Sequence, residues 1–388
     1  MVEVDDRSEY QTEHNRDLYS RIEYEFMIEL EKQPDGTEQR QVLRRQGELI
    51  LLLSKISKDI RFGSDNRAKK KDTLRKLLSD PSNDLLHFDP PLPLPLDPTV
   101  LITSCSPEEC RVFKSRMLPL LITFKTLDGK KYPLIFKTGD DLRQDQLVIQ
   151  IITLMDNLLR KENLDLRLSP YKILATSVTA GAVQFVESKT ITTIIRDHGS
   201  ILLYLRNNHP DQSNELGVRE EIIETYIRSC AGYCVITYLL GVGDRHAENL
   251  LVAPSGHFFH ADFGFILGRD PKPFAPAMRL SKDMVEGMGG QGHKNYRAFQ
   301  QYCYTAFMAL RKSSNLILNL FSLMQDANIP DIRVEPDKAV FKVTERFALD
   351  VTEEEAVQMF ESLIQESANA VMPALVDRVH GLMQYMRT

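Results

Sequence analysis

Apolar residues recur at three- and four-residue intervals through most of the first 80 residues. The runs DLYSRIEYEFMIELEK and RQGELILLLSKISKDI show this spacing, which is typical of amphipathic helices. We therefore expect residues 1–87 to form a separate helical element. A basic run lies within it, made of Arg67, Lys69, Lys70, Lys71, Arg75 and Lys76. A solvated helix face is the interpretation favoured for this run, over anion binding.

A proline-rich stretch, FDPPLPLPLDP at residues 88–98, ends the helical pattern. Its five prolines cannot continue a helix and favour an extended, stiff conformation. We predict that residues 88–98 form the linker to the next domain.

Short apolar strands follow the linker. VLITS, LLITFKTL and KYPLIFK have strand character, with LDGK at residues 127–130 as the turn between the last two. Residues 141–162 predict a helix that should pack on these strands, since it carries Leu147, Ile151, Met155 and Leu158 on one face. YKILATSV and GAVQFVES indicate two further strands. A small β-rich lobe over residues 99–187 is the result.

Long helices dominate residues 188–388, starting at REEIIETYIRSCAGYCVITYLLG. Near the end, Thr352 and Glu355 have the spacing of a capping box, and AVMPALVDRVHGLMQYM predicts a last amphipathic helix. The chain therefore has an α+β organisation in which a β-rich part precedes a helical one.

Composition narrows the class of protein further. With 388 residues, 43% hydrophobic and 26% charged, the chain is of ordinary globular type and long enough for two or three structural units. A net charge of -6 gives no reason to expect nucleic acid as a partner. No run of about 20 apolar residues occurs, and MVEVDDRSEY is unlike a signal peptide. We expect a cytoplasmic protein whose membrane contact is peripheral.

The five cysteines lack the spacing of a zinc site, so reduced thiols are expected. Cys230 and Cys234 lie four residues apart in an apolar helical stretch, which favours core packing for both.

Phosphoryl-transfer chemistry is indicated by GDRHAEN at residues 243–249 and ADFG at residues 261–264. Such transfer requires metal ions, a cation on the phosphates and a group that receives the proton of the attacking hydroxyl. Asp262 offers a carboxylate and Asn249 an amide oxygen, both of the hard type that Mg²⁺ or Mn²⁺ prefers. We predict that these two residues are the metal ligands.

The triplet Asp244-Arg245-His246 reverses the His-Arg-Asp order of protein kinases, while Asp244 still precedes Asn249 by five residues. The reversal puts an imidazole beside the reacting phosphate, where it could take a proton or stabilise negative charge. His246 is the candidate base, and Asp244 is the alternative. Together with Arg245 they form the predicted catalytic loop.

The phosphate-binding cation is predicted to be Lys137, at the end of the strand YPLIFK. Asp145, on the following helix, is the carboxylate expected to hold this lysine between nucleotides. Because no glycine-rich nucleotide motif is present, and Gly241-Val242-Gly243 lacks the third glycine, phosphate cover must come from elsewhere. VFKSRMLPLLITF fits a loop between two strands, in which Ser115 could bind phosphate.

IFKTGDDLRQD, GDRHAEN, HADFG and FGFILGRDPKPFAPAMRLSKDMVEGMGG together resemble the class III, vacuolar protein sorting type of phosphatidylinositol 3-kinase, over residues 97–388. The resemblance implies a bilobal, protein-kinase-like fold preceded by the end of a helical domain. It also implies that Tyr171 lines the adenine pocket and that Gln184, Phe185 and Val186 form the hinge, although an ordinary buried strand fits the latter equally well. The C2 domain and most of the helical domain of that family are not in this sequence, so we expect a fragment or a shortened product.

The activity implied by the resemblance is transfer of the ATP γ-phosphate to the 3-hydroxyl of phosphatidylinositol, serving endosomal sorting and autophagy on those membranes. Expected partners are a pseudokinase-like regulatory subunit and an autophagy scaffold subunit. Two alternatives are a catalytically silent binding module and a related kinase acting on protein or at the 4-hydroxyl.

Substrate choice should depend on the segment after DFG, where class I members carry a basic run. This chain has only Arg269, Lys272, Arg279 and Lys282 between Asp262 and Gly287. So few cations favour unphosphorylated phosphatidylinositol, with Arg269, Lys272 and Arg279 as the lipid substrate loop.

The last turns of the chain are apolar, through Leu382, Met383, Tyr385 and Met386, and lie beside Arg378 and Arg387. Core packing and a membrane-touching helix fit this pattern equally, and the resemblance favours the membrane. The family commonly has a tryptophan near Met386, which this chain lacks, and Ala247 and Ala261 replace larger aliphatic residues.

Overall fold

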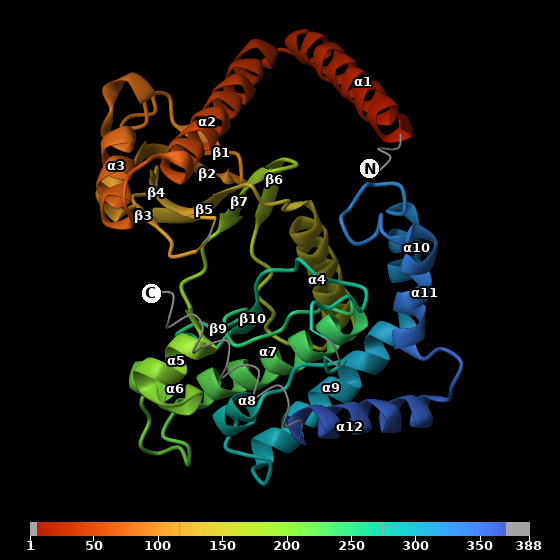
Figure 1. The fold of residues 1–388 in the computed structure, drawn as a ribbon. Helices are drawn as coiled ribbons and strands as arrows, with labels where there is room; N and C mark the ends of the chain where they lie inside the picture. The colour runs from red at the N-terminus through yellow and green to blue at the C-terminus, as the bar shows by residue number, and fades with distance from the viewer. Residues whose placement is uncertain (1–5, 116, 273–274, 370–388) are drawn as a thin grey trace. The chain divides into compact units, whose positions relative to one another are not determined.

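The computed structural model describes residues 6–115, 117–272 and 275–369 (Figure 1). These residues divide into two compact units. Unit 1 contains the described residues up to Asp140 together with Thr179–Val183. Unit 2 contains Asp141–Val178 and the described residues from Gln184 onward.

Unit 1 combines helices with an antiparallel sheet. Its helices are α1 (Asp6–Glu31), α2 (Gly36–Phe62), α3 (Arg67–Ser79) and the 3-10 turns η1 (Pro81–Asn83) and η2 (Pro107–Glu109). Its strands are β1 (Leu92–Leu94), β2 (Asp97–Cys105), β3 (Arg111–Val112), β4 (Leu120–Thr126), β5 (Lys131–Thr138) and β7 (Ala180–Gln184). They are ordered β1-β2-β4-β5-β7, with β3 paired to β4. The three predicted strands that follow the proline-rich stretch, and the turn at residues 127–130, are therefore confirmed.

Helix α2 places one apolar face on this sheet. Leu49, Leu53, Ile56 and Ile60 are buried and recur at helical spacing, and the helix packs on β1 and β5. This confirms the periodicity seen in the sequence.

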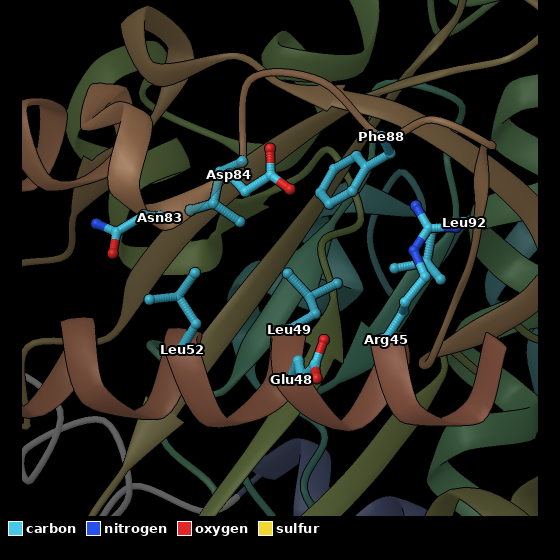
Figure 2. A pocket seen from close by; sticks show the side chains of 9 residues that line it. Arg45, Glu48, Leu49, Leu52, Asn83, Asp84, Phe88 and Leu92 are labelled. Atoms are coloured by element: carbon cyan, nitrogen blue, oxygen red, sulfur yellow. The ribbon is translucent and has the colours of Figure 1, made fainter. Parts of the chain in front are cut away.

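The proline-rich segment is extended only in part. Leu92–Leu94 is strand β1, residues 95–96 form a turn, and Asp97 begins β2, so the segment contributes a hairpin to the unit 1 sheet. Leu92 and Pro93 pair with β2. Arg45 Nη2 donates to Pro90 O at 2.7 Å and Gln46 Nε2 donates to Pro93 O at 2.8 Å, which ties the segment to α2. Figure 2 shows a pocket at this contact, where α2 side chains face Phe88 and Leu92. The boundary assigned to residues 88–98 stays a prediction.

The basic run on α3 is partly exposed, and one member differs from the prediction. Lys69, Lys71 and Lys76 are exposed, as a solvated face requires. Lys70 is buried, because its ammonium donates to Ile60 O and Gly63 O at the end of α2. A cation satisfies carbonyls that have no partner within the helix at such an end.

Unit 2 is mainly helical. Its helices are α4 (Arg143–Lys161), α5 (Ile191–His198), α6 (Ile201–Asn208), α7 (Glu220–Leu239), α8 (Lys282–Gly287), α9 (Lys294–Lys312), α10 (Ser314–Leu323), α11 (Pro336–Phe347) and α12 (Glu353–Asn369). Its strands are β6 (Ile173–Ser177), β8 (Lys189–Thr190), β9 (Leu250–Val252) and β10 (Phe258–His260). The last three form a small antiparallel sheet in the order β10-β9-β8, which the sequence pattern did not predict.

Helix α7 forms the core of unit 2, packed on α9 and β10 (Figure 1). Cys230 and Cys234 are buried in it, which confirms their predicted packing role. Helix α4 packs on β6 and α9, whereas the sequence analysis expected it on the three strands that follow the proline-rich stretch.

The capping box is also confirmed. Glu355 N donates to Thr352 Oγ1 at 3.2 Å, and Thr352 N donates to Glu355 Oε2 at 2.9 Å. The predicted last helix and its apolar residues 382–386 lie outside the described residues.

Candidate active site

A short hairpin brings the two kinase motifs together. The antiparallel register of β9 and β10 pairs Leu250 with His260, so Asn249 just before β9 meets Ala261 just after β10. Ala261 N donates to Asn249 O at 3.0 Å, which extends the ladder by one residue. Asn249 and Ala261, which belong to the two different motifs, are therefore neighbours in the structure.

Two hydrogen bonds hold the backbone of Asp244. Its N–H donates to Asp270 Oδ2 at 2.7 Å, and its carbonyl accepts from Asn249 Nδ2 at 3.1 Å. Its φ of 51° lies in the left-handed region, a strained conformation for a non-glycine residue that the surrounding contacts must maintain. The carboxylate has Lys272 Nζ at 3.3 Å and His246 Nε2 at 3.8 Å.

A backbone hydrogen bond indicates the tautomer of the His246 ring. Its Nδ1 accepts from Glu248 N at 3.3 Å, so the proton of the neutral ring is on Nε2, the atom near Asp244. The two candidate bases therefore lie side by side, and the choice between them stays a prediction.

Arg245 joins the catalytic loop to the DFG segment. Its Nε donates to Gly243 O and its Nη1 to Ala261 O, both at 2.8 Å, and its Nη2 donates to Asp262 O. The guanidinium also lies over the Phe263 ring, 5.7 Å from the centroid. Burial lowers the pKa of Arg245, partly offset by the nearby Asp262 and Asp244 carboxylates. Its donors are used for positioning.

Asp262 also has a positive φ, of 60°. The next peptide is fixed by α4, because Phe263 N donates to Asp145 Oδ1 at 3.0 Å. Asp145, predicted to hold Lys137, therefore contacts the DFG backbone within unit 2.

The chemistry of the donors fits a divalent metal. Asn249 uses its amide nitrogen on Asp244 O, so the amide oxygen is the end available to a cation. Among the described residues, no group of three or more His, Cys, Asp or Glu side chains could hold a metal. One carboxylate and one amide suit Mg²⁺, which commonly takes its other ligands from water and substrate phosphates.

His260 directly precedes the ADFG motif, and Tyr171 contacts the His260 backbone. The His260 ring stacks on Tyr233 with centroids 5.5 Å apart, and neither ring nitrogen has a hydrogen-bond partner among the described residues. Burial lowers the pKa of His260 well below its usual value, so the ring is neutral. Tyr171 is buried, its hydroxyl donates to His260 O at 3.4 Å, and burial raises its pKa well above the usual value.

The predicted hinge begins at Gln184, the last residue of β7. Gln184 N donates to Lys172 O at 2.8 Å and its Oε1 accepts from Lys172 N at 3.0 Å. Val186 O accepts from Ser188 Oγ at 2.9 Å. Phe185 lies between them, beyond the end of the strand, so GAVQFVES is a strand only as far as Gln184.

Lys137 and Ser115 belong to unit 1. Lys137, on β5, has its ammonium 3.4 Å from Asp140 Oδ2. Ser115 is exposed in the segment between β3 and β4, which confirms the predicted loop. Their roles towards phosphate, and the pairing of Lys137 with Asp145 of unit 2, stay predictions.

The three cations of the predicted lipid loop differ in their surroundings. Arg279 is buried, and Arg269 forms an ion pair with Asp331. Lys272 pairs with Asp244, so this cation lies at the catalytic loop.

Gly241 and Gly243 have a packing role that the sequence did not reveal. A Cβ on Gly243 would lie 2.0 Å from Arg269 O, and one on Gly241 would lie 2.4 Å from Gly268 N. Leu267 N and Gly268 N donate to Leu240 O and Gly241 O, both at 2.9 Å. The glycines thus let the segment after DFG approach the catalytic loop closely.

This site, in a helical unit that accompanies a sheet-rich one, has the features of a kinase-type phosphotransferase. The family model for phosphatidylinositol 3- and 4-kinase matches residues 131–334, more than half of the chain. The chain therefore belongs to the phosphatidylinositol 3- and 4-kinase family, and the predicted bilobal fold class is confirmed.

Similar proteins agree with this assignment. The chain is 57% identical over 375 residues to "Phosphatidylinositol 3-kinase pik3" of Schizosaccharomyces pombe, covering 96% of this chain and 47% of that protein. It is 50% identical over 349 residues to "Phosphatidylinositol 3-kinase VPS34" of Saccharomyces cerevisiae, covering 90% and 40% respectively. It is 49% identical over 353 residues to "Phosphatidylinositol 3-kinase, root isoform" of Glycine max, covering 91% and 43%. The predicted resemblance to the class III type is confirmed.

The chain spans less than half the length of these relatives. Across its described part, none of the helices combines the length and apolar character needed to cross a bilayer.

Proposed function

We propose that this chain is the catalytic region of a phosphatidylinositol 3-kinase, which transfers the ATP γ-phosphate to the 3-hydroxyl of phosphatidylinositol. The observation that carries the proposal is the contact between the two motifs: Ala261 N donates to Asn249 O beside the β9–β10 hairpin, and Arg245 donates to Ala261 O and Asp262 O. The names of the similar proteins supply the substrate and the position of transfer.

The roles of the residues follow from their chemistry. Asn249 and Asp262 would hold Mg²⁺ or Mn²⁺, which when bound would neutralise charge on the phosphates. His246 or Asp244 would accept the proton of the inositol hydroxyl, and Arg245 would keep both motifs in register.

The nucleotide contacts rest on the resemblance and on residue type. Lys137 would bind phosphate oxygens, with Ser115 as a second phosphate contact. Gln184, Phe185 and Val186 would form the hinge, and Tyr171 the wall of the adenine pocket.

The surroundings of the loop cations support an acceptor with few phosphates. Because Arg279 is buried and Arg269 is paired with Asp331, Lys272 is the loop cation beside the catalytic loop. A bisphosphate headgroup would require additional exposed cations.

The cellular setting is proposed from the resemblance. The product, phosphatidylinositol 3-phosphate, would serve endosomal sorting and autophagy on the membranes where the protein binds peripherally. Residues 382–386 would contact the bilayer, and a pseudokinase-like regulatory subunit and an autophagy scaffold subunit would be partners.

The test measures transfer of radiolabelled phosphate from ATP to vesicles that contain phosphatidylinositol, with chromatography to locate the phosphate. Wild type should give the 3-phosphate, and Asp262→Asn should lower the rate at least 100-fold, since it removes the charged metal ligand. Asp326→Asn, which changes an exposed aspartate, is the matched control.

Three other outcomes would each change part of the proposed function. Undiminished product from Asp262→Asn would refute the metal site. A 4-phosphate or a phosphorylated protein would change the acceptor. Nucleotide binding without turnover on any lipid would favour a silent binding module.

A further inference from the structure

Gln144 and Asp331 are buried polar residues without a role in the chemistry described above. Gln144 lies in the first turn of α4, and Asp331 lies between α10 and α11. Gln144 is 2% exposed and Asp331 is 6% exposed. Polar groups in a protein interior need hydrogen-bond partners.

Asp331 uses both carboxylate oxygens on the segment that follows DFG. Its Oδ2 accepts from Ile266 N at 2.7 Å. Its Oδ1 accepts from Arg269 Nη1 in an ion pair. One side chain therefore holds a backbone amide and a guanidinium three residues apart.

Gln144 connects Asp331 to DFG itself. Its Nε2 donates to Phe263 O at 2.9 Å and to Asp331 Oδ2 at 3.2 Å. Its Oε1 accepts from Asp331 N at 2.8 Å. The neighbouring Asp145 accepts from Phe263 N, so the first turn of α4 holds both polar groups of Phe263.

We propose that Asp331, supported by Gln144, is a positioning residue that fixes residues 263–269 and thereby aims the Asp262 carboxylate at the metal. The inference rests on the proposed function, because it assigns Asp331 and Gln144 to that same site. Phe263 O, Ile266 N and the Arg269 side chain are all held by this pair, while Arg245 holds the Asp262 carbonyl from the other side. Asp262 has a positive φ, which requires such support on both sides.

A purely structural role of Asp331 would affect stability alone, whereas a positioning role would also change the Mg²⁺ requirement. The test therefore separates a structural role from a positioning role. Asp331→Asn keeps the shape of the side chain and removes its charge, which weakens the bonds to both Ile266 N and Arg269. Gln144→Met keeps the length and removes every hydrogen bond, as a second variant. Asp156→Asn is the matched control. Asp156 is a buried carboxylate on α4, the helix that carries Gln144, and it pairs with Arg160 at 2.9 Å.

The full chain is examined by hydrogen exchange of the Ile266 amide, by thermal unfolding, and by titration of lipid kinase activity with Mg²⁺. In Asp331→Asn we expect Ile266 exchange to be about tenfold faster, equivalent to the loss of one net hydrogen bond. The Mg²⁺ concentration for half-maximal activity should rise about tenfold, the lower end of the 10- to 100-fold effect of groups that orient metal ligands. Gln144→Met should shift both measurements in the same direction, and Asp156→Asn neither.

Unchanged Ile266 exchange in folded Asp331→Asn would overturn the inference. So would activity that falls only with the folded fraction, at an unaltered Mg²⁺ requirement. If wild type makes no lipid phosphate, the proposed function fails, and Mg²⁺ is titrated against binding of ADP instead. A shifted requirement for ADP binding would then support the positioning role, and an unshifted one would refute it.

Discussion

Replacement of Gly243 by alanine tests the close approach between the catalytic loop and the segment after DFG. The added Cβ would lie 2.0 Å from Arg269 O and 3.0 Å from Asp270 Oδ2. Since Cβ contacts under 3.0 Å are essentially absent from proteins, one backbone must move by about 1 Å.

Neither backbone can move independently. Gly243 N donates to Phe265 O at 2.9 Å, and Asp244 N donates to Asp270 Oδ2 at 2.7 Å. Overpacking at such a site costs about 1–3 kcal/mol of unfolding free energy. A displacement of about 1 Å near reacting groups costs about 100-fold in rate. Gly243→Ala should therefore lower kcat far more than its loss of stability explains.

The assay compares lipid kinase kcat and thermal unfolding for Gly243→Ala and Gly292→Ala. A Cβ on Gly292 meets nothing within 4 Å, so this control should change unfolding by less than about 0.5 kcal/mol and leave kcat unchanged. Equal kcat in the two variants would refute the close approach.

Further expectations concern charge, pH and thiols. Lys272→Met should lower kcat/KM for phosphatidylinositol vesicles about tenfold, because it removes the cation beside Asp244, whereas Lys282→Met, which alters an exposed lysine paired with Glu286, should have little effect. The hydrogen bond from Thr352 N lowers the pKa of Glu355 below its ordinary 4.5, so this carboxylate stabilises the fold above pH 4.5 and loses that effect as the pH falls through the lowered pKa. The difference in thermal unfolding between wild type and Glu355→Gln should thus be present at pH 7 and vanish in acid; a constant difference would contradict it. All five cysteines are buried, and burial raises the pKa of Cys230, Cys234 and Cys303, so a thiol reagent at neutral pH should react in denaturant and hardly at all in the native protein.

Local patterns predicted the larger elements because each is specified by its own residues. Helix α2 buries Leu49, Leu53 and Ile56, whose spacing is visible in the sequence. The capping box of Thr352 and Glu355 is likewise contained in four residues. Strands β9 and β10 were missed because each has only three residues, too few for alternation to be recognised.

The positions that organise the site depend on contacts across long sequence separations. Gly243 could be seen to be a glycine, but the carbonyl that excludes its Cβ belongs to Arg269. Lys70 looked like part of a solvated face, but the end of α2 supplies carbonyls that draw it inside. In both cases the residue type is visible in the sequence, and only the fold supplies the partner that decides its role.

Arg245, the middle residue of the reversed triplet, also depends on contacts across the sequence. Arg245 donates to the carbonyls of Gly243, Ala261 and Asp262, so the residue between Asp244 and His246 in the chain is fixed to the DFG segment. Asp244 Oδ2 and His246 Nε2 are 3.8 Å apart. Lys272 Nζ lies 3.3 Å from the other oxygen of the same carboxylate, so the Asp244 side chain has the imidazole on one oxygen and the ammonium on the other. Since His246 Nδ1 accepts from Glu248 N, the Nε2–H side of the ring faces Asp244, and the loop brings both candidate bases to the same point.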